Sequence, residues 1–270
     1  MKSLTRNLAA TSMAMLMLVA MGCGASTKSP TGVTSESITP ADNAAQSDGR
    51  LDQSSKDRDA PRPSVMKAPP LGAVAGYAIL AGSTITNTGL TVITGDLGLS
   101  PGSAVTGFPP GILNGIKHVS DPAAALAKSD LTKAYNNLAG RTLAPILVAG
   151  NLGGRTLAPG LYKSSSSLEV SSGDLTLDAK GNGNAVFIFQ MASTLNTTAG
   201  RKVILAGGAK ASNIFWQVGS SATIGTTSVF KGSILADQSI SLNTGASLQG
   251  RALARIGGVT LAANSVVAPN

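Results

Sequence analysis

The segment TIGTTSVFKGSILA at residues 223–236 is followed eighteen residues later by a similar segment, SLNTGASLQGRALA at residues 241–254. A third, partial copy begins at residue 259. In each copy apolar and small polar residues alternate, as in strands that bury one of their two faces, so Ile224 and Phe230 are expected to point inward. A repeat of this length fits one turn of a three-sided solenoid whose sides are strands of about four to six residues.

Short strand-forming runs occur well before these repeats. From residue 71 onward, runs such as AILA at 78–81 and LTVI at 90–93 are separated by Gly, Asn and Ser-Pro-Gly. Runs of this kind, rich in branched residues and separated by turn residues, predict strands. We therefore expect residues 71–270 to form a mainly β domain, a three-sided β-solenoid.

One helix interrupts the strands, at about residues 121–139. Asp121 is suited to cap its start, Pro122 to its first turn, and Gly140 to its end. Between them Ala127, Leu131 and other apolar residues recur at helical spacing on one side. A single amphipathic helix in a strand-rich chain is expected to pack alongside the β body and bury that side.

The N-terminal residues predict export. Lys2 and Arg6 precede an apolar run over residues 8–21 that is too short to span a bilayer comfortably, so residues 1–22 are expected to be a signal peptide. The run ends just before Cys23, the only cysteine, in an arrangement that resembles bacterial lipoprotein signals, in which this cysteine is acylated. The alternative is an ordinary secretory signal with a chance cysteine. We expect a protein attached by lipid at the bacterial outer membrane or cell surface, or otherwise secreted.

The next segment, residues 23–70, is rich in Ser, Thr, Asp, Lys, Ala and Pro. It offers too little apolar surface to offset the entropy lost when a chain becomes ordered, so it is predicted to be a disordered polar tether. Six basic and six acidic residues between Lys28 and Lys67 leave this stretch neutral.

The formal net charge of +8 raises the question of nucleic-acid binding. The basic residues of the solenoid region are scattered, without interleaved aromatic residues for base stacking. We therefore expect no nucleic-acid partner, no membrane contact except through the N-terminal lipid, and a monomer.

Catalysis is not expected. The single histidine, His118, stands just ahead of the helix, and no His/Cys cluster has the spacing of metal ligands. Asp96 and Asp174 occupy like positions in two similar segments, which favours a role in holding turns over a role in chemistry. The sequence thus predicts no catalytic residue, no metal and no cofactor.

Several motifs together resemble the microbial ice-binding protein family. They are NLGGRTLAPGLY at 151–162, GDLTLD at 173–178, AVFIFQ at 185–190, FWQVGSSAT at 215–223, GRALA at 250–254 and VTL at 259–261. The resemblance covers residues 71–270. It implies a discontinuous three-sided β-solenoid with a long helix alongside, and adsorption to ice through one flat face. It also implies thermal hysteresis and inhibition of ice recrystallisation.

The family resemblance also implies candidate ice-contacting residues. Some members carry Thr-Ala/Gly-x-Thr/Asn on the ice face; residues 88–91 fit this motif, residues 244–247 fit it with Ser, and residues 226–229 and 198–201 depart from it. The residues expected on this face are Thr88, Thr91, Ser172, Thr176, Thr198, Thr226, Thr244, Ser247 and Ser265. The neighbouring face, with Thr223, Ser241 and Thr260, is the alternative.

Two other functions stay open. One is a cell-envelope adhesion or carbohydrate-binding module, which exposed Trp or Tyr would favour; the only Trp, Trp216, is expected to point inward. The other is a polysaccharide lyase or hydrolase, which would need acids facing each other across a groove.

Overall fold

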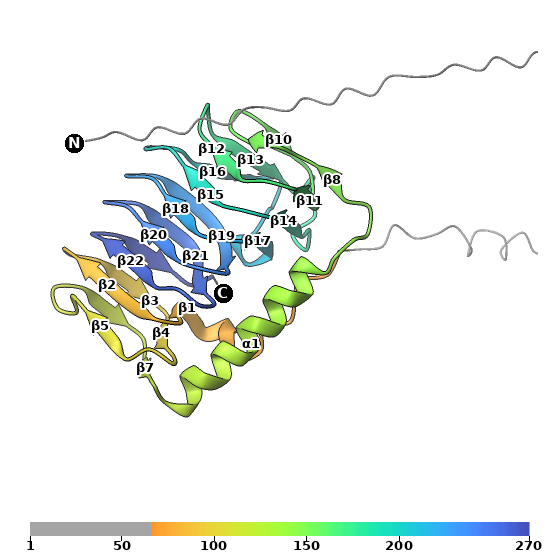
Figure 1. The fold of residues 1–270 in the computed structure, drawn as a ribbon. Coiled ribbons are helices and arrows are strands. Elements are labelled where there is room, and N and C mark those ends of the chain that lie inside the picture. The colour runs from red at the N-terminus through yellow and green to blue at the C-terminus, as the bar shows by residue number, and fades with distance from the viewer. Residues whose placement is uncertain (1–65, 270) are drawn as a thin grey trace, which may run out of the picture. The chain divides into compact units, whose positions relative to one another are not determined.

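The structure, a computed structural model, describes residues 66–269. The predicted signal peptide (1–22), the predicted lipid-attachment residue Cys23 and the tether up to residue 65 lie outside the described residues. Within the described range the chain forms a stack of β coils with one long helix alongside, as Figure 1 shows. The predicted fold class, a mainly β discontinuous solenoid with one long helix, is confirmed.

Each coil crosses three faces in a fixed order, which we name A, B and C. Face A holds β1 (Tyr77–Ala81), β4 (Asp96–Leu99), β7 (Lys117–Val119), β8 (Ile146–Leu147), β11 (Gly160–Ser164), β14 (Phe187–Met191) and β17 (Ile214–Val218). Face B holds β2 (Thr84–Thr88), β5 (Ala104–Thr106), β9 (Gly150–Asn151), β12 (Leu168–Val170), β15 (Leu195–Thr197), β18 (Ala222–Ile224), β20 (Ile240–Leu242) and β22 (Val259–Ala262). Face C holds β3 (Val92–Thr94), β6 (Ile112–Asn114), β10 (Thr156–Leu157), β13 (Leu175–Asp178), β16 (Val203–Ala206) and β23 (Ser265–Val267).

Two long strands belong to two faces. In β19 (Val229–Ala236) and β21 (Ser247–Ala254) the first half lies on face C and the second half on face A. The change comes at Gly232, with φ +102°, and at Gly250, where a Cβ atom would lie 1.9 Å from the Gly232 carbonyl oxygen. Only glycine fits so tight a corner.

The strands pair in parallel, and their order in space differs from their order in the sequence. The N-terminal strands stack beside the C-terminal ones: β1 pairs with β21 (Ile79↔Ala252) and β2 with β22 (Ile85↔Val259). Because of this junction, a single eight-stranded sheet forms the whole of face B, in the order β5-β2-β22-β20-β18-β15-β12-β9.

The interior is filled by the alternate side chains that point inward, including Ile224 and Phe230 as predicted. Four aromatic rings from successive coils form a buried column: the ring centroids of Tyr162 and Phe189 are 5.1 Å apart, those of Phe189 and Trp216 3.9 Å, and those of Trp216 and Phe230 5.0 Å. Rings of this size bury large apolar areas, and close pairing adds further stabilisation of about 0.5–1.5 kcal/mol per pair. The column fixes the spacing of the coils that carry the outer faces.

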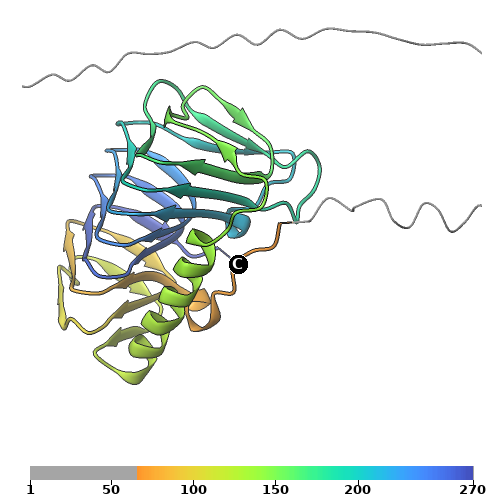
Figure 2. The same ribbon diagram turned by 45° about the vertical axis from the view of Figure 1, so that its right-hand side comes forward.

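The helix α1 (Pro122–Ala139) covers face A (Figures 1 and 2). Its start is capped as expected, since the Asp121 carboxylate accepts a 2.7 Å hydrogen bond from the Ala124 amide. Ala124, Ala127, Leu131, Ala134, Tyr135 and Leu138 are its buried side chains. No helix within residues 66–269 is long and apolar enough to cross a membrane.

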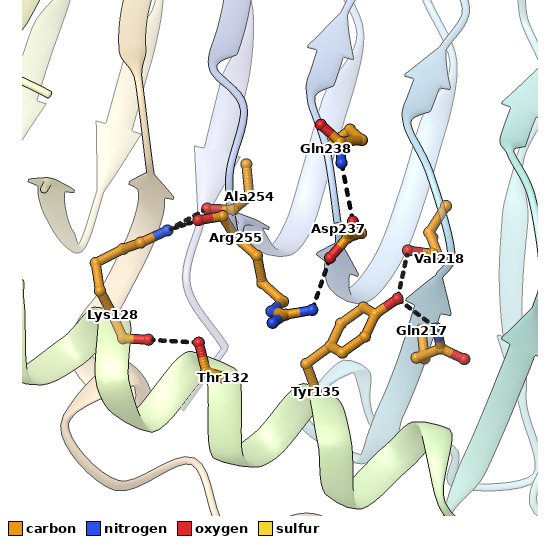
Figure 3. A network of polar contacts seen from close by, with 9 residues as sticks. All are labelled: Lys128, Thr132, Tyr135, Gln217, Val218, Asp237, Gln238, Ala254 and Arg255. Atoms are coloured by element: carbon orange, nitrogen blue, oxygen red, sulfur yellow. Dashed lines mark hydrogen bonds and ion pairs between the residues drawn. The ribbon is translucent and has the colours of Figure 1, made fainter. Parts of the chain in front are cut away.

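Polar contacts also attach α1 to face A, as Figure 3 shows. The Lys128 ammonium donates to the backbone carbonyls of Ala254 and Arg255, at the end of β21. Tyr135 donates to the Val218 carbonyl at 3.2 Å, and its ring lies 4.5 Å from the Arg255 guanidinium. Burial lowers the pKa of Lys128 to about 8, with the nearby Arg255 charge as a second cause. The helix therefore covers face A except near β8, where Leu147 is exposed, and it leaves faces B and C exposed.

Candidate functional site

Face B presents a continuous row of polar side chains, most of them small and uncharged. Strand register places one outward residue of each strand beside the next, and this row runs Thr106, Thr86, Thr260, Ser241, Thr223, Asn196, Glu169, Asn151. Adjacent strands in such a sheet lie about 4.7–4.9 Å apart. The side chains of Thr86 and Thr260 are close enough for a 3.4 Å contact between their hydroxyl oxygens.

Face B carries the most outward threonines where the first and last coils of the described residues meet. Strand β2 alternates exposed and buried residues, so Thr84, Thr86 and Thr88 all point outward. Same-face neighbours on one strand are separated by about 6.6–6.8 Å. The three threonines therefore form a regular line across face B, at right angles to the long row.

Face B is stiff and almost uncharged. The inward residues behind the row, such as Ile85, Ile240 and Leu195, are fully buried. In its eight strands Glu169 is the only charged residue, and its carboxylate accepts a 2.9 Å hydrogen bond from the Ser171 hydroxyl. Threonine has few rotamers because it is branched at Cβ. The outward threonines of face B are thus short and restricted in conformation.

Face C is built from the same coils but has a different surface. One of its rows runs from Lys231 through Gln249, Val267 and Thr94 to Asn114. The Lys231 ammonium donates to the Gln249 side chain at 2.7 Å, and a hollow of about 290 Å³ lies beside these two residues. Ile204 and Ile112, on strands further along, are also exposed. Face C therefore mixes long, charged and aliphatic side chains and is uneven.

The nine residues predicted for the ice face do not lie on one face. Thr88 ends a strand of face B; Ser172, Thr198, Thr226 and Thr244 lie in the turns from face B to face C and are not buried. Thr176, Ser247 and Ser265 lie on strands of face C. The structure thus distributes the predicted site over the edge between faces B and C and over face C itself.

The prediction needs a correction at Thr91, which is completely buried. Its hydroxyl donates to the Asn87 side-chain carbonyl and accepts a 3.0 Å hydrogen bond from the backbone amide of Asn264. The Thr-Gly-x-Thr pattern of residues 88–91 is a turn, with φ +77° at Gly89. Thr88, the first threonine, is exposed, whereas the second, Thr91, stabilises the turn from the protein interior. Thr91 therefore cannot contact ice at the protein surface.

Thr91 belongs to a buried polar seam inside the edge between faces B and C, made of Asn87, Thr91, Thr197, Ser228 and Asn264. The side-chain amide of Asn264 donates to the backbone carbonyls of Asn243 and Ala246, in the turn of the next coil, at 2.8 and 3.0 Å. Thr197 accepts from the Gly225 amide at 2.7 Å and donates to Ser228 at 3.2 Å. Buried turn groups need such partners. The seam therefore fixes the turns that border face B.

The residues that sequence reasoning left out of the main prediction are those of the long row. Thr86 and Thr260 lie 174 residues apart in the chain, so their proximity follows only from the junction between the first and last coils. The neighbouring face suggested as an alternative, with Thr223, Ser241 and Thr260, is face B. The alternation TITNT in residues 84–88 could have identified the remaining outward threonines of face B from the sequence.

The titratable residues considered for catalysis have structural partners. Asp96 and Asp174 each accept a 2.9 Å hydrogen bond from a backbone amide of the next coil, that of Ile116 and that of Lys202, as expected for turn-holding residues. His118 lies 2.8 Å from Asp121 at the start of α1. The Ala124 amide and His118 lower the pKa of the Asp121 carboxyl group. Residues 66–269 contain no group of three or more His, Cys, Asp or Glu residues that could hold a metal ion.

Comparison with known proteins agrees with this architecture. Residues 79–267 match the family model described as ice-binding-like. An ice-binding protein of Nostoc sp. (strain HG1) is 49% identical over 197 residues, which cover 73% of this chain and 72% of the relative. An ice-binding protein of Flavobacterium frigoris (strain PS1) is 38% identical over 213 residues, 74% of this chain and 76% of the relative.

Solved structures agree as well. The crystal structure of an ice-binding protein from an Antarctic biological consortium superimposes with a TM-score of 0.76 at 57% sequence identity, covering 77% of this chain and 95% of that chain. A match of this extent in both sequence and structure shows the family. The chain belongs to the ice-binding-like family.

Proposed function

We propose that this protein binds ice by adsorbing through face B. The observation that carries the proposal is the unbroken row of eight outward residues, from Thr106 to Asn151, of which only Glu169 is charged. Face A is covered by α1, and face C carries Lys231 and a hollow. Face B thus has the extent, flatness and small side chains that a crystalline surface requires.

The proposed mechanism is physical adsorption, without a chemical step. Threonine hydroxyls and methyl groups at regular spacings order a layer of water that merges with the ice lattice. Contact over a flat area then removes weakly polar surface from liquid water, and many small dispersion contacts add up. Stiff side chains lose little entropy on contact, whereas a lysine such as Lys231 would lose much more.

Adsorption of this kind gives thermal hysteresis and slows recrystallisation, because ice can grow only between the bound molecules. We place this activity outside the cytoplasm, in a monomer that is exported and attached by lipid at Cys23, or secreted if Cys23 is not acylated. The support for this setting is the N-terminal sequence pattern.

The second candidate function, carbohydrate binding or adhesion, has less support. Sugars stack on exposed aromatic rings, yet Trp216 is fully buried. Among the aromatic side chains of residues 66–269, only Phe108 is not buried. Within residues 66–269, neither hollow is lined by an acidic residue, so a catalytic function has no paired acids in a groove to support it.

The test compares two matched substitutions in residues 66–270. Thr260→Tyr places a ring on face B beside Thr86, and Thr94→Tyr places one at a threonine of face C that is also exposed. We expect Thr260→Tyr to reduce hysteresis and incorporation into growing ice to about a tenth, a change of roughly 1.4 kcal/mol in adsorption. Thr94→Tyr should keep the parent activity. A parent domain that is excluded from growing ice would refute ice binding, and the reverse ranking of the two variants would move the site to face C.

A further inference from the structure

A second surface of interest lies at the end of the stack where α1 leads into β8. Here the corner between faces C and A is hollow, with a cavity of about 590 Å³. Met66, Arg141, Leu143, Ile146, Pro159 and Val186 contribute to its lining. Figure 1 shows the chain passing from α1 to β8 at this end. Because each coil crosses faces A, B and C in turn, the corner between C and A is the one opposite face B.

The segment from α1 to β8 exposes an unusual amount of aliphatic surface. Leu143 is 62% exposed, Ile146 45% and Leu147 79%, all within five residues. Elsewhere in the described residues no more than two large exposed aliphatic side chains, Ile112 and Ile116, fall within five residues. Others, such as Leu90 and Leu126, stand apart in the sequence, and single exposed residues of this type are ordinary. A cluster beside a cavity marks an interaction surface.

Basic side chains surround this cluster. Lys67 and Arg141 line the cavity, and Lys163 is the register partner of Leu147 on the neighbouring strand. The Lys210 side chain passes close to Gly183, at the same corner. The ion pairs formed among residues 66–269 involve other basic residues: His118, Lys133, Lys180 and Arg255. The four basic groups at this end are therefore not neutralised by a carboxylate of the described chain.

We propose that this end of the solenoid docks on a lipid bilayer with anionic headgroups. Leu143 and Leu147 enter the headgroup region, while Lys67, Arg141 and Lys163 lie at the depth of the lipid phosphates. Each basic residue near such a surface strengthens binding about fivefold. A second copy of the chain fits less well, since it would bring two sets of unpaired positive charges together.

The course of the chain supports the same partner. Residues 1–65 precede the described body, and they join it at Met66, which lines the cavity. Figure 2 shows the segment that follows Met66 starting near the C-terminal end of α1, and Arg141 donates to the Lys67 carbonyl there. Attachment of the N-terminal part to a membrane, as proposed for Cys23, would bring this end of the body toward the bilayer. Face B, on the opposite side, would then be directed away from it.

The test uses residues 66–270, which include the complete stack and the helix. A solved relative of which 95% is covered has essentially this extent, so the fragment is expected to fold on its own. The fragment lacks Cys23, so lipid attachment cannot contribute. Co-sedimentation would be measured with vesicles of phosphatidylcholine alone and of an equal mixture with phosphatidylglycerol, at low and high salt.

We expect at least about tenfold more binding to the anionic vesicles, and a loss of this preference at high salt because surface charges are screened. The double variant Leu143→Asp/Leu147→Asp should bind about tenfold more weakly, and Lys163→Gln about fivefold, equivalent to ~1 kcal/mol. Leu126→Asp, at an exposed leucine of α1, is the matched control and should bind like the parent.

Thermal melting checks that every variant is folded, and ice hysteresis should stay unchanged in all of them. Because this proposal does not depend on ice binding, a failure of either one leaves the other standing. Equal or absent binding to the two kinds of vesicle would overturn it. So would an equal loss of binding with Leu126→Asp, or a dimer in sedimentation equilibrium that the Leu143→Asp/Leu147→Asp variant abolishes.

Discussion

Faces B and C are made by the same coils, share one core and receive their outward residues from the same alternation, yet their surfaces differ. On face B the strands carry Thr, Ser and Asn in register, whereas the equivalent row of face C contains Lys231, Gln249 and Val267. The solenoid therefore provides regular spacing to both faces. The two faces differ in the length and mobility of the side chains that occupy these regularly spaced positions.

The corner between the two faces adds a second difference. The buried seam with Thr91, Asn264 and Thr197 lies under the edge of face B and fixes its turns through hydrogen bonds. At the other corners the chain is held by different means, such as the glycines at 232 and 250 where strands pass from C to A. The regularity of face B thus depends on both the shared core and a local polar seam.

The largest effect is expected from the core that both faces share. Trp216→Ala removes one of the two inner rings of the aromatic column, whose centroid lies 3.9 Å from that of Phe189. We expect the free energy of unfolding to fall by about 3–5 kcal/mol, because a large buried ring leaves a cavity. Chemical denaturation measures this. A loss below about 1 kcal/mol would show that the column does not hold the coils together.

A smaller loss of stability, which affects the edge of face B but not face C, is expected when the buried seam is changed. Asn264→Ala leaves the Asn243 and Ala246 carbonyls without their side-chain donor, at a cost of about 1–3 kcal/mol. Ice hysteresis should fall as well, because the turns bordering face B lose their support. Ser247→Ala, on face C in the neighbouring coil, should change the unfolding free energy by less than about 0.5 kcal/mol. Equal effects of the two variants on hysteresis would contradict a special role of the seam.

The third face provides a pH-dependent prediction. The folded-state pKa of Lys128 is about 8, below the 10.5 of the free side chain, so between these values the unfolded chain holds the proton more tightly. Raising the pH from about 8 to 10 should therefore stabilise the fold, by less than about 1.4 kcal/mol per pH unit. The measurement is denaturation of the parent and of Lys128→Met across this range. A difference between them that stays constant with pH would refute the shifted pKa.

The smallest effect is expected from extending face B. Glu169 places a charge in the row between Asn196 and Asn151, so Glu169→Thr should raise hysteresis modestly by lengthening the uncharged part of the row. Gln249→Thr makes a comparable change on face C and should leave hysteresis at the parent level. An increase with Gln249→Thr alone would indicate that face C contacts ice.

Much of the fold could be predicted from the sequence because it depends on local pattern. The eighteen-residue repeat predicted the coils. Asp121 and Pro122 predicted the start of a helix at about residues 121–139, and α1 runs from Pro122 to Ala139. The alternation in the repeats also identified inward residues such as Phe230. Periodicity and capping act over a few residues, so they can be read without knowing which coils are neighbours.

The site was harder to predict because it depends on contacts that are distant in the sequence. Thr86 becomes the neighbour of Thr260 only through the junction of the first and last coils. The Thr-x-x-Thr motif was also misleading at Thr91, since a turn with positive φ at Gly89 rotates the second threonine into the interior. Strand alternation does not apply in such a turn, so the sequence pattern assigned Thr91 to the wrong side.

The central claim is that face B, and not face C, contacts ice, and site-specific labelling tests it most directly. Residues 66–270 contain no cysteine, so Thr86→Cys on β2 and Thr94→Cys on β3 give single thiols at two exposed positions of the same coil. Each variant is assayed for incorporation into growing ice before and after reaction with a bulky maleimide. We predict that both unlabelled variants enter the ice and that only the label at residue 86 prevents it. Exclusion caused by the label at residue 94, with free incorporation of the one labelled at residue 86, would contradict the claim.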